Sequence, residues 1–227
     1  MGIAGAQRGD GVISAVIFDM DGLLLDSEVY WERARQEFAT STGCVWTDQD
    51  ELDVKGMNSP EWAALIKRRC GLDTELSQII VEVTARMQRL YEEHLPLLPG
   101  AVEAVRAAAT RYPLGLASSS PRGLIELVLT GAGIREDFTA VVSSDEVGKG
   151  KPNPAVFLEA ARLLGTQPNR VAVFEDSSAG ILAAHAAAMR VIVVPNPHYP
   201  PSADALALAD AVLQSLADFT LDLLKRL

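Results

Sequence analysis

The sequence predicts an α/β protein whose parallel sheet is interrupted after its first strand by a helical insertion. Residues 13–18 form a short apolar run rich in Val, Ile and Phe, which is typical of a buried strand. The next stretch, about 70 residues long, has helical patterns and no convincing strand. Beyond it, helices alternate with short apolar strands, which indicates βαβ units. The first strand must join that later sheet, so we predict a core of residues 1–26 and 99–227 and a helical cap of residues 27–98.

Three segments of the insertion have clear helical patterns, at residues 28–40, 60–70 and 75–94. Ser27 and Thr74 are expected to cap the first and third helices. Ser59, followed by proline and glutamate, marks the start of the second helix. Linkers near Asp26 and at residues 96–100 join the insertion to the core. They would let the cap close over the ends of the strands.

The alternating region supplies the rest of the sheet. Its strands are predicted at residues 114–117, 140–143, 171–174 and 191–194, and its helices at residues 101–110, 122–129, 155–164 and 179–188. Parallel strands joined by helices give a Rossmann-like sheet with helices on both faces. Because the carboxyl ends of parallel strands meet at one edge, residues that follow the strands are expected to share a crevice there.

The overall charge of the chain bears on which kinds of macromolecule or surface it binds. The chain of 227 residues has 30 acidic and 20 basic residues, and its net charge of −10 disfavours nucleic acids and anionic membranes. The basic run of Lys67, Arg68 and Arg69 lies in a predicted helix and is interpreted as a solvated face. The apolar stretches are shorter than the roughly 20 residues of a membrane-spanning helix. We therefore expect neither a nucleic-acid nor a membrane partner.

The N-terminal segment and the cysteines bear on the compartment. Residues 1–11 lack the charged and long apolar segments of a signal peptide and are interpreted as a flexible leader. Cys44 and Cys70 have no metal-ligand pattern and no disulfide framework around them, so they are expected to be packing residues in a reducing environment. These features favour a cytoplasmic protein, and we expect a monomer.

Two pairs of acidic residues follow predicted strands. Asp19 and Asp21 come directly after the first strand, and Gly22 allows a sharp turn behind them. Such a pair on its own is more typical of a polar turn. Glu175 and Asp176 follow another strand, so four carboxylates are expected at one edge of the sheet. Two like charges 4 Å apart repel by roughly 4 kcal/mol at an effective dielectric constant of 20, so the cluster favours a hard divalent cation such as Mg²⁺.

Serines and a lysine follow two further strands. Ser118, Ser119 and Ser120 lie between a strand and a helix, where hydroxyls and exposed amides hold an anion or simply cap the helix. Lys151 lies in a segment framed by glycine and proline that would fix its position. A solvated lysine in the loop before a helix has the same local pattern.

Together these motifs resemble the haloacid dehalogenase superfamily, in its phosphatase branch with a helical cap. The motifs occur in order as Asp19-Met20-Asp21-Gly22, Leu116-Ala117-Ser118, Lys151-Pro152 and Glu175-Asp176, and the resemblance covers nearly the whole chain. The resemblance implies that Asp19 attacks phosphorus to give an aspartyl-phosphate. It also implies that Asp21 first protonates the leaving alcohol and then activates water.

The same resemblance identifies the groups that would neutralise charge. Ser118 and Lys151 would stabilise the transferring phosphoryl group, with Ser119 and Ser120 beside them. The implied Mg²⁺ ligands are Asp19, Asp176 and the main-chain carbonyl of Asp21, with Glu175 close by or in the outer shell.

The motifs also bear on the branch of the superfamily. The acid pair argues against a dehalogenase, because members that cleave carbon–halogen bonds lack the second acid. A rival is a phosphomutase similar to β-phosphoglucomutase, but its cap histidine and arginine fall on Trp31 and about Ser59 here. The chain is more similar to bacterial sugar phosphatases of the hexitol-phosphate and 2-deoxyglucose-6-phosphate type. A non-catalytic sensor of phosphorylated metabolites is the third alternative, and the intact motifs argue against it.

The cap contains candidate contacts for the substrate. Trp31 would pack on the apolar face of a sugar, or it serves ordinary helix packing. Lys55 and Asn58 lie near the predicted tip of the cap and are candidate specificity residues, although a solvated loop has the same pattern. His198 follows the last predicted strand and either lines the rim or belongs to the loop. The expected activity is Mg²⁺-dependent hydrolysis of a small phosphorylated sugar or sugar alcohol.

Overall fold

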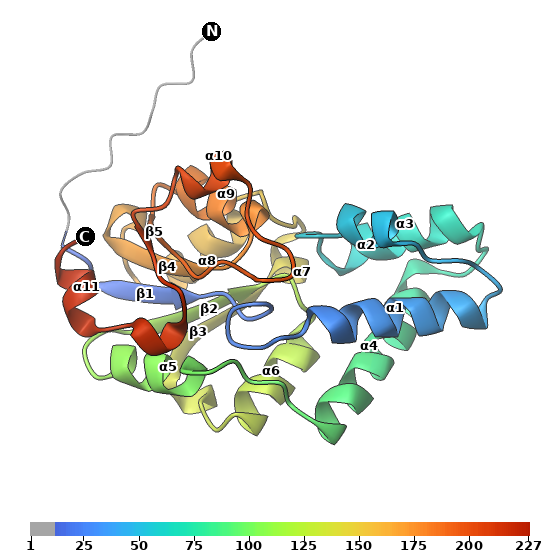
Figure 1. The fold of residues 1–227 in the computed structure, drawn as a ribbon, viewed down its shortest axis with the longest axis horizontal. Helices are drawn as coiled ribbons and strands as arrows, with labels where there is room; N and C mark the ends of the chain where they lie inside the picture. The colour runs from blue at the N-terminus through green and yellow to red at the C-terminus, as the bar shows by residue number, and fades with distance from the viewer. Residues whose placement is uncertain (1–11) are drawn as a thin grey trace, which may run out of the picture.

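A parallel six-stranded sheet forms the centre of the protein in the computed structural model, which describes residues 12–227 (Figure 1). The leader interpreted at residues 1–11 lies outside the described residues. The strands are β1 (Ala15–Phe18), β2 (Leu114–Ser118), β3 (Phe138–Ser143), β4 (Val171–Glu175), β5 (Arg190–Val193) and β6 (Ala211–Val212). Their order across the sheet is β3-β2-β1-β4-β5-β6. The predicted α/β class is confirmed, whereas β6 is too short to leave an apolar pattern in the sequence.

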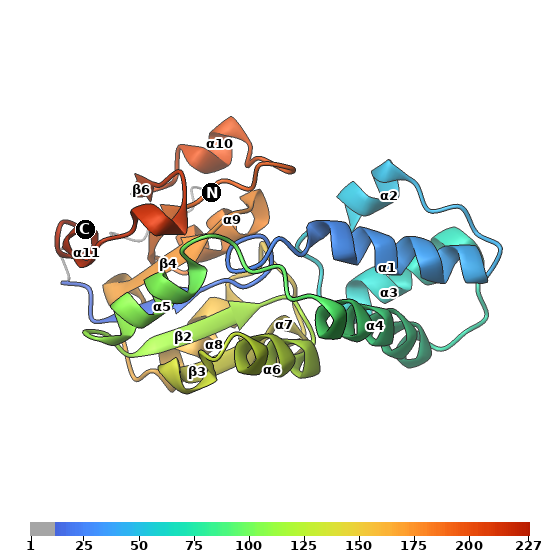
Figure 2. The same ribbon diagram turned by 60° about the horizontal axis from the view of Figure 1, so that its bottom comes forward.

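Helices cover both faces of this sheet (Figure 2). One face packs against α8 (Ala155–Leu163) and α9 (Ser178–Ala186), the other against α5 (Ala101–Ala109) and α6 (Arg122–Gly131). Alternate residues of β1 point to opposite faces, because successive side chains of a strand alternate. Ile17 belongs to the apolar cluster beneath α8 and α9, and Phe18 to the cluster on the α5 and α6 side. Burial on both faces explains why β1 is an uninterrupted apolar run.

Short elements complete the core, and none of them was predicted. They are α7 (Ser144–Val147), α10 (Ala203–Leu206), α11 (Leu221–Lys225) and three 3₁₀ turns at Arg135–Asp137, Pro168–Arg170 and Leu216–Asp218. Each is too brief for a helical apolar period to be recognised.

The insertion between β1 and β2 carries α1 (Glu28–Ser41), α2 (Asp48–Asp53), α3 (Ser59–Cys70) and α4 (Leu76–Glu93) to one side of the sheet (Figures 1 and 2). The helical insertion is confirmed, while its limits at residues 27–98 stay a prediction. Its linkers run side by side: the Asp26 amide donates to the Pro96 carbonyl and the Leu98 amide to the Leu24 carbonyl, each at 2.9 Å. The two linkers therefore support each other where the insertion meets the sheet.

Two predicted helix caps of the insertion, at Ser27 and Thr74, are wrong. The predicted start of α3 at Ser59 is confirmed, and Asn58 caps this helix by accepting from the Glu61 amide at 3.1 Å. Ser27 precedes α1 but makes no capping hydrogen bond, and α4 begins after Glu75 rather than Thr74. The Ser27 hydroxyl donates instead to Asp21, which lies in the loop after β1. Tertiary contacts thus replace the local cap that the sequence pattern favours.

The two cysteines form a disulfide, so their interpretation as separate packing residues is wrong. Cys44 follows α1 and Cys70 ends α3, and their Cα atoms lie 5.3 Å apart. Helix packing brings these ends together, which the spacing of the cysteines in the sequence does not reveal. The compartment and the monomeric state stay predictions. Among residues 12–227, no helix combines the length and the apolar character that crossing a bilayer requires.

Candidate active site

The acidic residues meet where the order of the strands changes direction. The chain proceeds from β1 outward to β2 and β3, then returns to the opposite side of β1 with β4. Such a switch point opens a crevice at the carboxyl ends of the strands. Phe18 and Phe174 are paired in register, so Asp19 and Glu175, one residue further on, emerge beside each other. The sheet therefore places two carboxylates together by its register alone.

Lys151 lies between these carboxylates. Its Nζ is 2.6 Å from Asp19 Oδ1 and 2.6 Å from Glu175 Oε1, and it donates to the Ala117 carbonyl at 3.2 Å. The side chain is almost fully buried. Burial acts to lower the pKa of Lys151, but the charges of Asp19 and Glu175 outweigh burial and raise it. The ammonium group therefore stays charged over the physiological range.

One ammonium does not balance the acidic cluster. Asp19, Glu175 and Asp176 each offer an oxygen within 4.8 Å of the others, and all three residues are buried. Burial raises the pKa of Asp19 to about 7, although Lys151 opposes this shift. Burial and the charge of Glu175 likewise raise the pKa of Asp176 well above its usual value. An all-oxygen set with excess negative charge fits a hard divalent cation.

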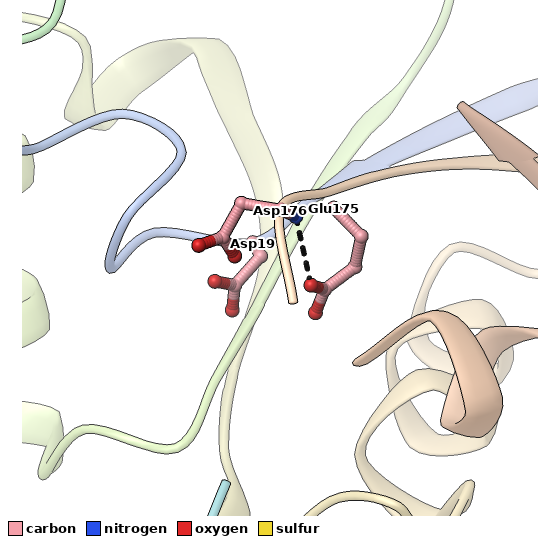
Figure 3. A group of neighbouring side chains, drawn as sticks. All are labelled: Asp19, Glu175 and Asp176. Carbon is pink, nitrogen blue, oxygen red and sulfur yellow. Dashed lines mark hydrogen bonds between the residues drawn. The ribbon is translucent and has the colours of Figure 1, made fainter. Parts of the chain in front are cut away.

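The three carboxylates are not equivalent in this cluster. Figure 3 shows those of Asp19 and Asp176 next to each other, while that of Glu175 turns back on the other side of the chain. Glu175 Oε2 accepts from the Asp176 amide at 3.0 Å and the Ser177 amide at 3.1 Å, and Oε1 accepts from Lys151. With both oxygens engaged by protein donors, Glu175 acts as an organiser of the cluster. Asp19 and Asp176 are the better candidates for metal ligands.

Glycine is required where the loop after β1 approaches Asp176. Gly22 has a φ of 78°, and a Cβ added there would lie 2.1 Å from Asp176 Oδ2. Both the positive φ and the close approach exclude a side chain at this position. Asn196, which follows β5, donates to Asp176 Oδ2 at 3.2 Å and so helps to fix the carboxylate.

The Asp21 carboxylate is held by hydroxyl and indole donors. Its Oδ2 accepts from Ser118 Oγ at 3.2 Å and from Ser120 Oγ at 2.7 Å. Its Oδ1 accepts from Ser27 Oγ at 2.8 Å and from Trp31 Nε1 at 3.0 Å. Asp21 thus lies close to Asp19 without a direct ammonium partner of its own, an arrangement suited to accepting and releasing a proton.

A cavity of about 560 Å³ opens above these residues between the core and the insertion. Asp19, Asp21, Lys151 and Asp176 line its core side. The insertion contributes Glu28, Leu52, Lys55 and Gly56, and the loop after β5 contributes His198, Tyr199 and Pro200. A second cavity of about 80 Å³ is bordered by Trp31, Arg35 and Trp62 of the insertion and by Asp21 and Ser120 of the core.

The structure places the predicted cap residues differently from one another. Lys55 lines the large cavity, is ion-paired with Glu28 and has its Nζ 3.9 Å from the centre of the Tyr199 ring. Trp31 is buried and points its indole N–H at Asp21. Asn58 is only 1% exposed, and its carboxamide is occupied in capping α3, so this geometry gives no support to a substrate contact. Helix capping and ligand recognition favour the same residue type, which explains the error.

The three serines predicted to bind the phosphoryl group also lie in different surroundings. Ser119 lines both cavities and donates to the Gly56 carbonyl of the insertion at 3.2 Å. Ser118 is fully buried, and Ser120 borders only the smaller cavity. His198 lines the large cavity, with Nε2 3.8 Å from Asp26 Oδ2.

Sequence reasoning missed three residues of the site. Tyr91, near the end of α4, points its hydroxyl at Asp21 Oδ1 from 3.5 Å. Asn196 supports Asp176, and Tyr199 faces Lys55. Asn196 follows a predicted strand, and the rule that selected Glu175 would also have selected it. Tyr91 has no such signal, because its distance from Asp21 depends on the packing of the insertion.

Comparisons with known proteins show similarity to hydrolases and phosphatases. The model of the haloacid dehalogenase-like hydrolase family matches residues 13–188. The chain is 41% identical to hexitol phosphatase B of Escherichia coli (strain K12) over 211 residues, which cover 92% of this chain and 95% of the relative. It is 33% identical to fructose-1-phosphate phosphatase YqaB of the same strain over 183 residues, covering 80% and 96%.

A solved structure shares the fold over most of its length. The crystal structure of β-phosphoglucomutase from Clostridium difficile superposes with a TM-score of 0.81 and covers 94% of this chain and 96% of that chain. The sequence identity is 24%, so this likeness concerns the fold alone.

Proposed function

The chain belongs to the haloacid dehalogenase-like hydrolase family and is a phosphoric monoester hydrolase, and we propose that its substrates are small phosphorylated sugars or sugar alcohols. The observation that carries the proposal is the buried Asp19–Lys151 pair, 2.6 Å apart, in the wall of a cavity shared with the insertion. The names of the two phosphatase relatives support this substrate class.

The first half of the reaction is transfer of the phosphoryl group to Asp19. A carboxylate oxygen of Asp19 forms a bond to phosphorus, and the bond from phosphorus to the substrate oxygen breaks. Lys151 holds the Asp19 carboxylate through Oδ1 and brings positive charge next to the attacked phosphoryl group. Ser119 lines the cavity wall, and we infer that its hydroxyl exchanges its bond to the Gly56 carbonyl for one to a phosphoryl oxygen. The product of this half is an aspartyl-phosphate.

Asp21 handles the proton in both halves. In its acid form it gives a proton to the departing alkoxide oxygen, and as a carboxylate it then accepts a proton from the attacking water. Water attack on phosphorus releases inorganic phosphate and regenerates the Asp19 carboxylate. Ser118 and Ser120 hold Asp21 through Oδ2 and keep its carboxyl group in the site during both halves.

We assign Mg²⁺ to Asp19 and Asp176, with the main-chain carbonyl of Asp21 as a further ligand and Glu175 as the organiser behind them. When bound, the ion neutralises phosphoryl charge and the excess negative charge of the cluster. Asn196 and Glu175 orient the Asp176 residue from two sides, through its side chain and its amide.

The cavity favours a substrate larger than phosphate alone. Its volume of about 560 Å³ is within the usual range for small-molecule sites, about 300–1,000 Å³. Lys55, Glu28 and His198 offer charged and hydrogen-bonding groups on the side opposite Asp19. Such groups suit the hydroxyls of a sugar or hexitol, while Leu52 and Tyr199 supply apolar surface.

The test is a release assay for inorganic phosphate over hexitol, hexose, pentose and glycolate phosphates with Mg²⁺. We expect a hexitol or hexose phosphate to give the highest kcat/KM. Asp19→Asn should lower it at least about 10⁴-fold while the protein stays folded. Asp73→Asn, on the exposed surface of the insertion, is the matched control and should leave it unchanged.

Two outcomes would replace the proposal. Isomerisation of β-glucose 1-phosphate with little release of phosphate would identify a phosphomutase. Absence of hydrolysis across the whole panel by folded, Mg²⁺-loaded protein would favour a sensor of phosphorylated metabolites.

A further inference from the structure

The insertion reaches the acid–base residue directly, through two aromatic side chains. Trp31 Nε1 lies 3.0 Å from Asp21 Oδ1, and the Tyr91 hydroxyl lies 3.5 Å from the same oxygen. Trp31 is in the first turn of α1 and Tyr91 in the last turn of α4, two helices that lie side by side (Figures 1 and 2). The helical ends that face the core therefore converge on a single carboxylate oxygen.

The two oxygens of Asp21 are held by different parts of the molecule. The core holds Oδ2 through Ser118 and Ser120, in the loop after β2. Trp31 and Tyr91 of the insertion hold Oδ1, together with Ser27 where the linker meets α1. The orientation of this carboxylate is therefore fixed jointly by hydroxyls of the core and by donors of the insertion.

Trp31 is itself held in a rigid setting. The Arg35 guanidinium lies 4.9 Å from the centre of its ring, and the Trp62 ring contacts it edge-on at 6.2 Å between centroids. Arg35 is buried and ion-paired with Glu51, which also accepts from Trp46 Nε1 at 2.9 Å. The indole N–H therefore has a direction fixed by the interior of the insertion.

Tyr91 is equally suited to act as a donor. Its side chain is buried, and its phenolic hydroxyl is a hydrogen-bond donor that faces Asp21 Oδ1.

We propose that Trp31 and Tyr91 are positioning residues that orient Asp21 toward the leaving oxygen. This inference rests on the proposed phosphatase function. It also gives Trp31 a role other than the predicted packing against a sugar ring.

A positioning role predicts a dependence on the leaving group. When an alkyl phosphate reacts, the bond from phosphorus to the alkoxide oxygen breaks and that oxygen takes the proton of Asp21. When p-nitrophenyl phosphate reacts, p-nitrophenolate departs as a stable anion and needs no proton. Misorientation of Asp21 therefore slows formation of the aspartyl-phosphate from an alkyl substrate and spares the aryl substrate.

The first experiment compares kcat/KM of Trp31→Phe on sorbitol 6-phosphate and on p-nitrophenyl phosphate. We expect a loss of about ten- to a hundredfold on the alkyl ester, as for a lost hydrogen bond to a charged group, and less than about threefold on the aryl ester. Tyr91→Phe should show the same split with a smaller loss, because its contact is longer. Equal losses on both substrates would overturn the proposal.

Trp46→Phe is the matched control for this comparison. It removes an indole donor from the same insertion, but that donor serves Glu51 rather than Asp21. It should show no difference between the two substrates. A split as large as that of Trp31→Phe would mean that destabilising the insertion explains the effect.

The second experiment needs no activity and so separates this inference from the proposed function. The chain has three tryptophans, and their indole N–H groups give separate signals in ¹H–¹⁵N NMR spectra. Asp21→Ala should shift the Trp31 indole signal strongly, because its acceptor is lost, while the Trp46 signal stays in place. An unmoved Trp31 signal would refute the positioning contact even in an active phosphatase. Inactive wild-type protein with the expected shift would refute only the proposed function.

Discussion

The core edge and the insertion contribute to the site in different ways. At the core edge, Asp19, Lys151 and Glu175 are buried charges held by strand ends, and the pairing of β1 with β4 brings the two acids together. The insertion contributes hydrogen bonds and ring contacts from helix ends, through residues such as Trp31 and Tyr91. The edge of the sheet thus supplies the charged groups that carry out the reaction, and the insertion orients them. Substitutions in the two regions should therefore impair the enzyme in different ways.

Among variants that keep the nucleophile Asp19, the largest expected effect comes from removing the ammonium of the core edge. Lys151→Met leaves three neighbouring buried carboxylates without their cation. We expect kcat/KM to fall at least about a thousandfold and the free energy of unfolding to fall by about 3–5 kcal/mol, as for a broken buried ion pair. Steady-state kinetics and chemical denaturation measure both.

Lys149→Met is the control for this change, because it alters an exposed lysine two residues away. It should leave activity and stability unchanged. If Lys151→Met retained near wild-type kcat/KM, the assignment of chemistry to the core edge would be wrong.

The next prediction distinguishes Glu175, which organises the acidic cluster, from Asp176, which is a proposed metal ligand. Glu175→Gln replaces one oxygen that accepts protein hydrogen bonds with a group that donates them. We expect a loss of about a hundredfold in kcat, with the Mg²⁺ concentration for half-maximal activity changing less than in Asp176→Asn. Mg²⁺ titrations of activity compare the variants. A larger loss of apparent Mg²⁺ affinity in Glu175→Gln would make Glu175 a direct ligand.

A smaller effect concerns the pH dependence of the metal-free protein. Burial raises the pKa of Asp19 from 3.8 to about 7, so between these values the folded protein binds more protons than the unfolded chain. The raised pKa of Asp19 therefore makes the free energy of unfolding fall as the pH rises from about 4 to about 7. In chelator, Asp19→Asn should flatten the decrease of Tm between about pH 4 and 7, by about 2–4 °C for each kcal/mol involved.

Asp73→Asn, at an exposed position, should reproduce the wild-type pH profile of Tm. An unchanged slope in Asp19→Asn would show that Asp19 is ionised in the metal-free fold throughout this range. The negative charge of the cluster would then be balanced within the protein.

The smallest effect on activity is expected at the disulfide, which links Cys44, after α1, to Cys70, at the end of α3. These helix ends lie on the side of the insertion remote from the sheet (Figure 1). The double variant Cys44→Ser/Cys70→Ser should lose about 2–4 kcal/mol of unfolding free energy. Its kcat/KM should change by less than about threefold, because neither cysteine lines a cavity of the site. Denaturation curves and steady-state kinetics measure the two quantities. A large drop in kcat/KM would show that the helix ends joined by the disulfide are coupled to the active site.

The difference between the core edge and the insertion also explains which parts of the site the sequence predicts well. Asp19 and Glu175 follow apolar strands, and parallel topology forces such residues to one edge, so local pattern suffices. Trp31 was identified as a residue near the site, but its partner was not, because the direction of the indole depends on Arg35 and Trp62. Tyr91 and the Cys44–Cys70 pair depend on how helices of the insertion pack, and no local pattern encodes that. Prediction succeeded where backbone register sets the geometry and failed where side-chain packing sets it.

We propose that Asp19 at the core edge carries the phosphoryl group between the two halves of the reaction. The Asp21→Ala variant allows a direct test. Reaction with p-nitrophenyl phosphate needs no acid in its first half, whereas release of phosphate needs the base that this variant lacks. We expect a burst of about one p-nitrophenolate per protein molecule and, after acid quenching, a phosphoryl group mapped by peptide mass spectrometry to Asp19. A protein without a covalent phosphoryl group, or with one on another residue, would contradict it.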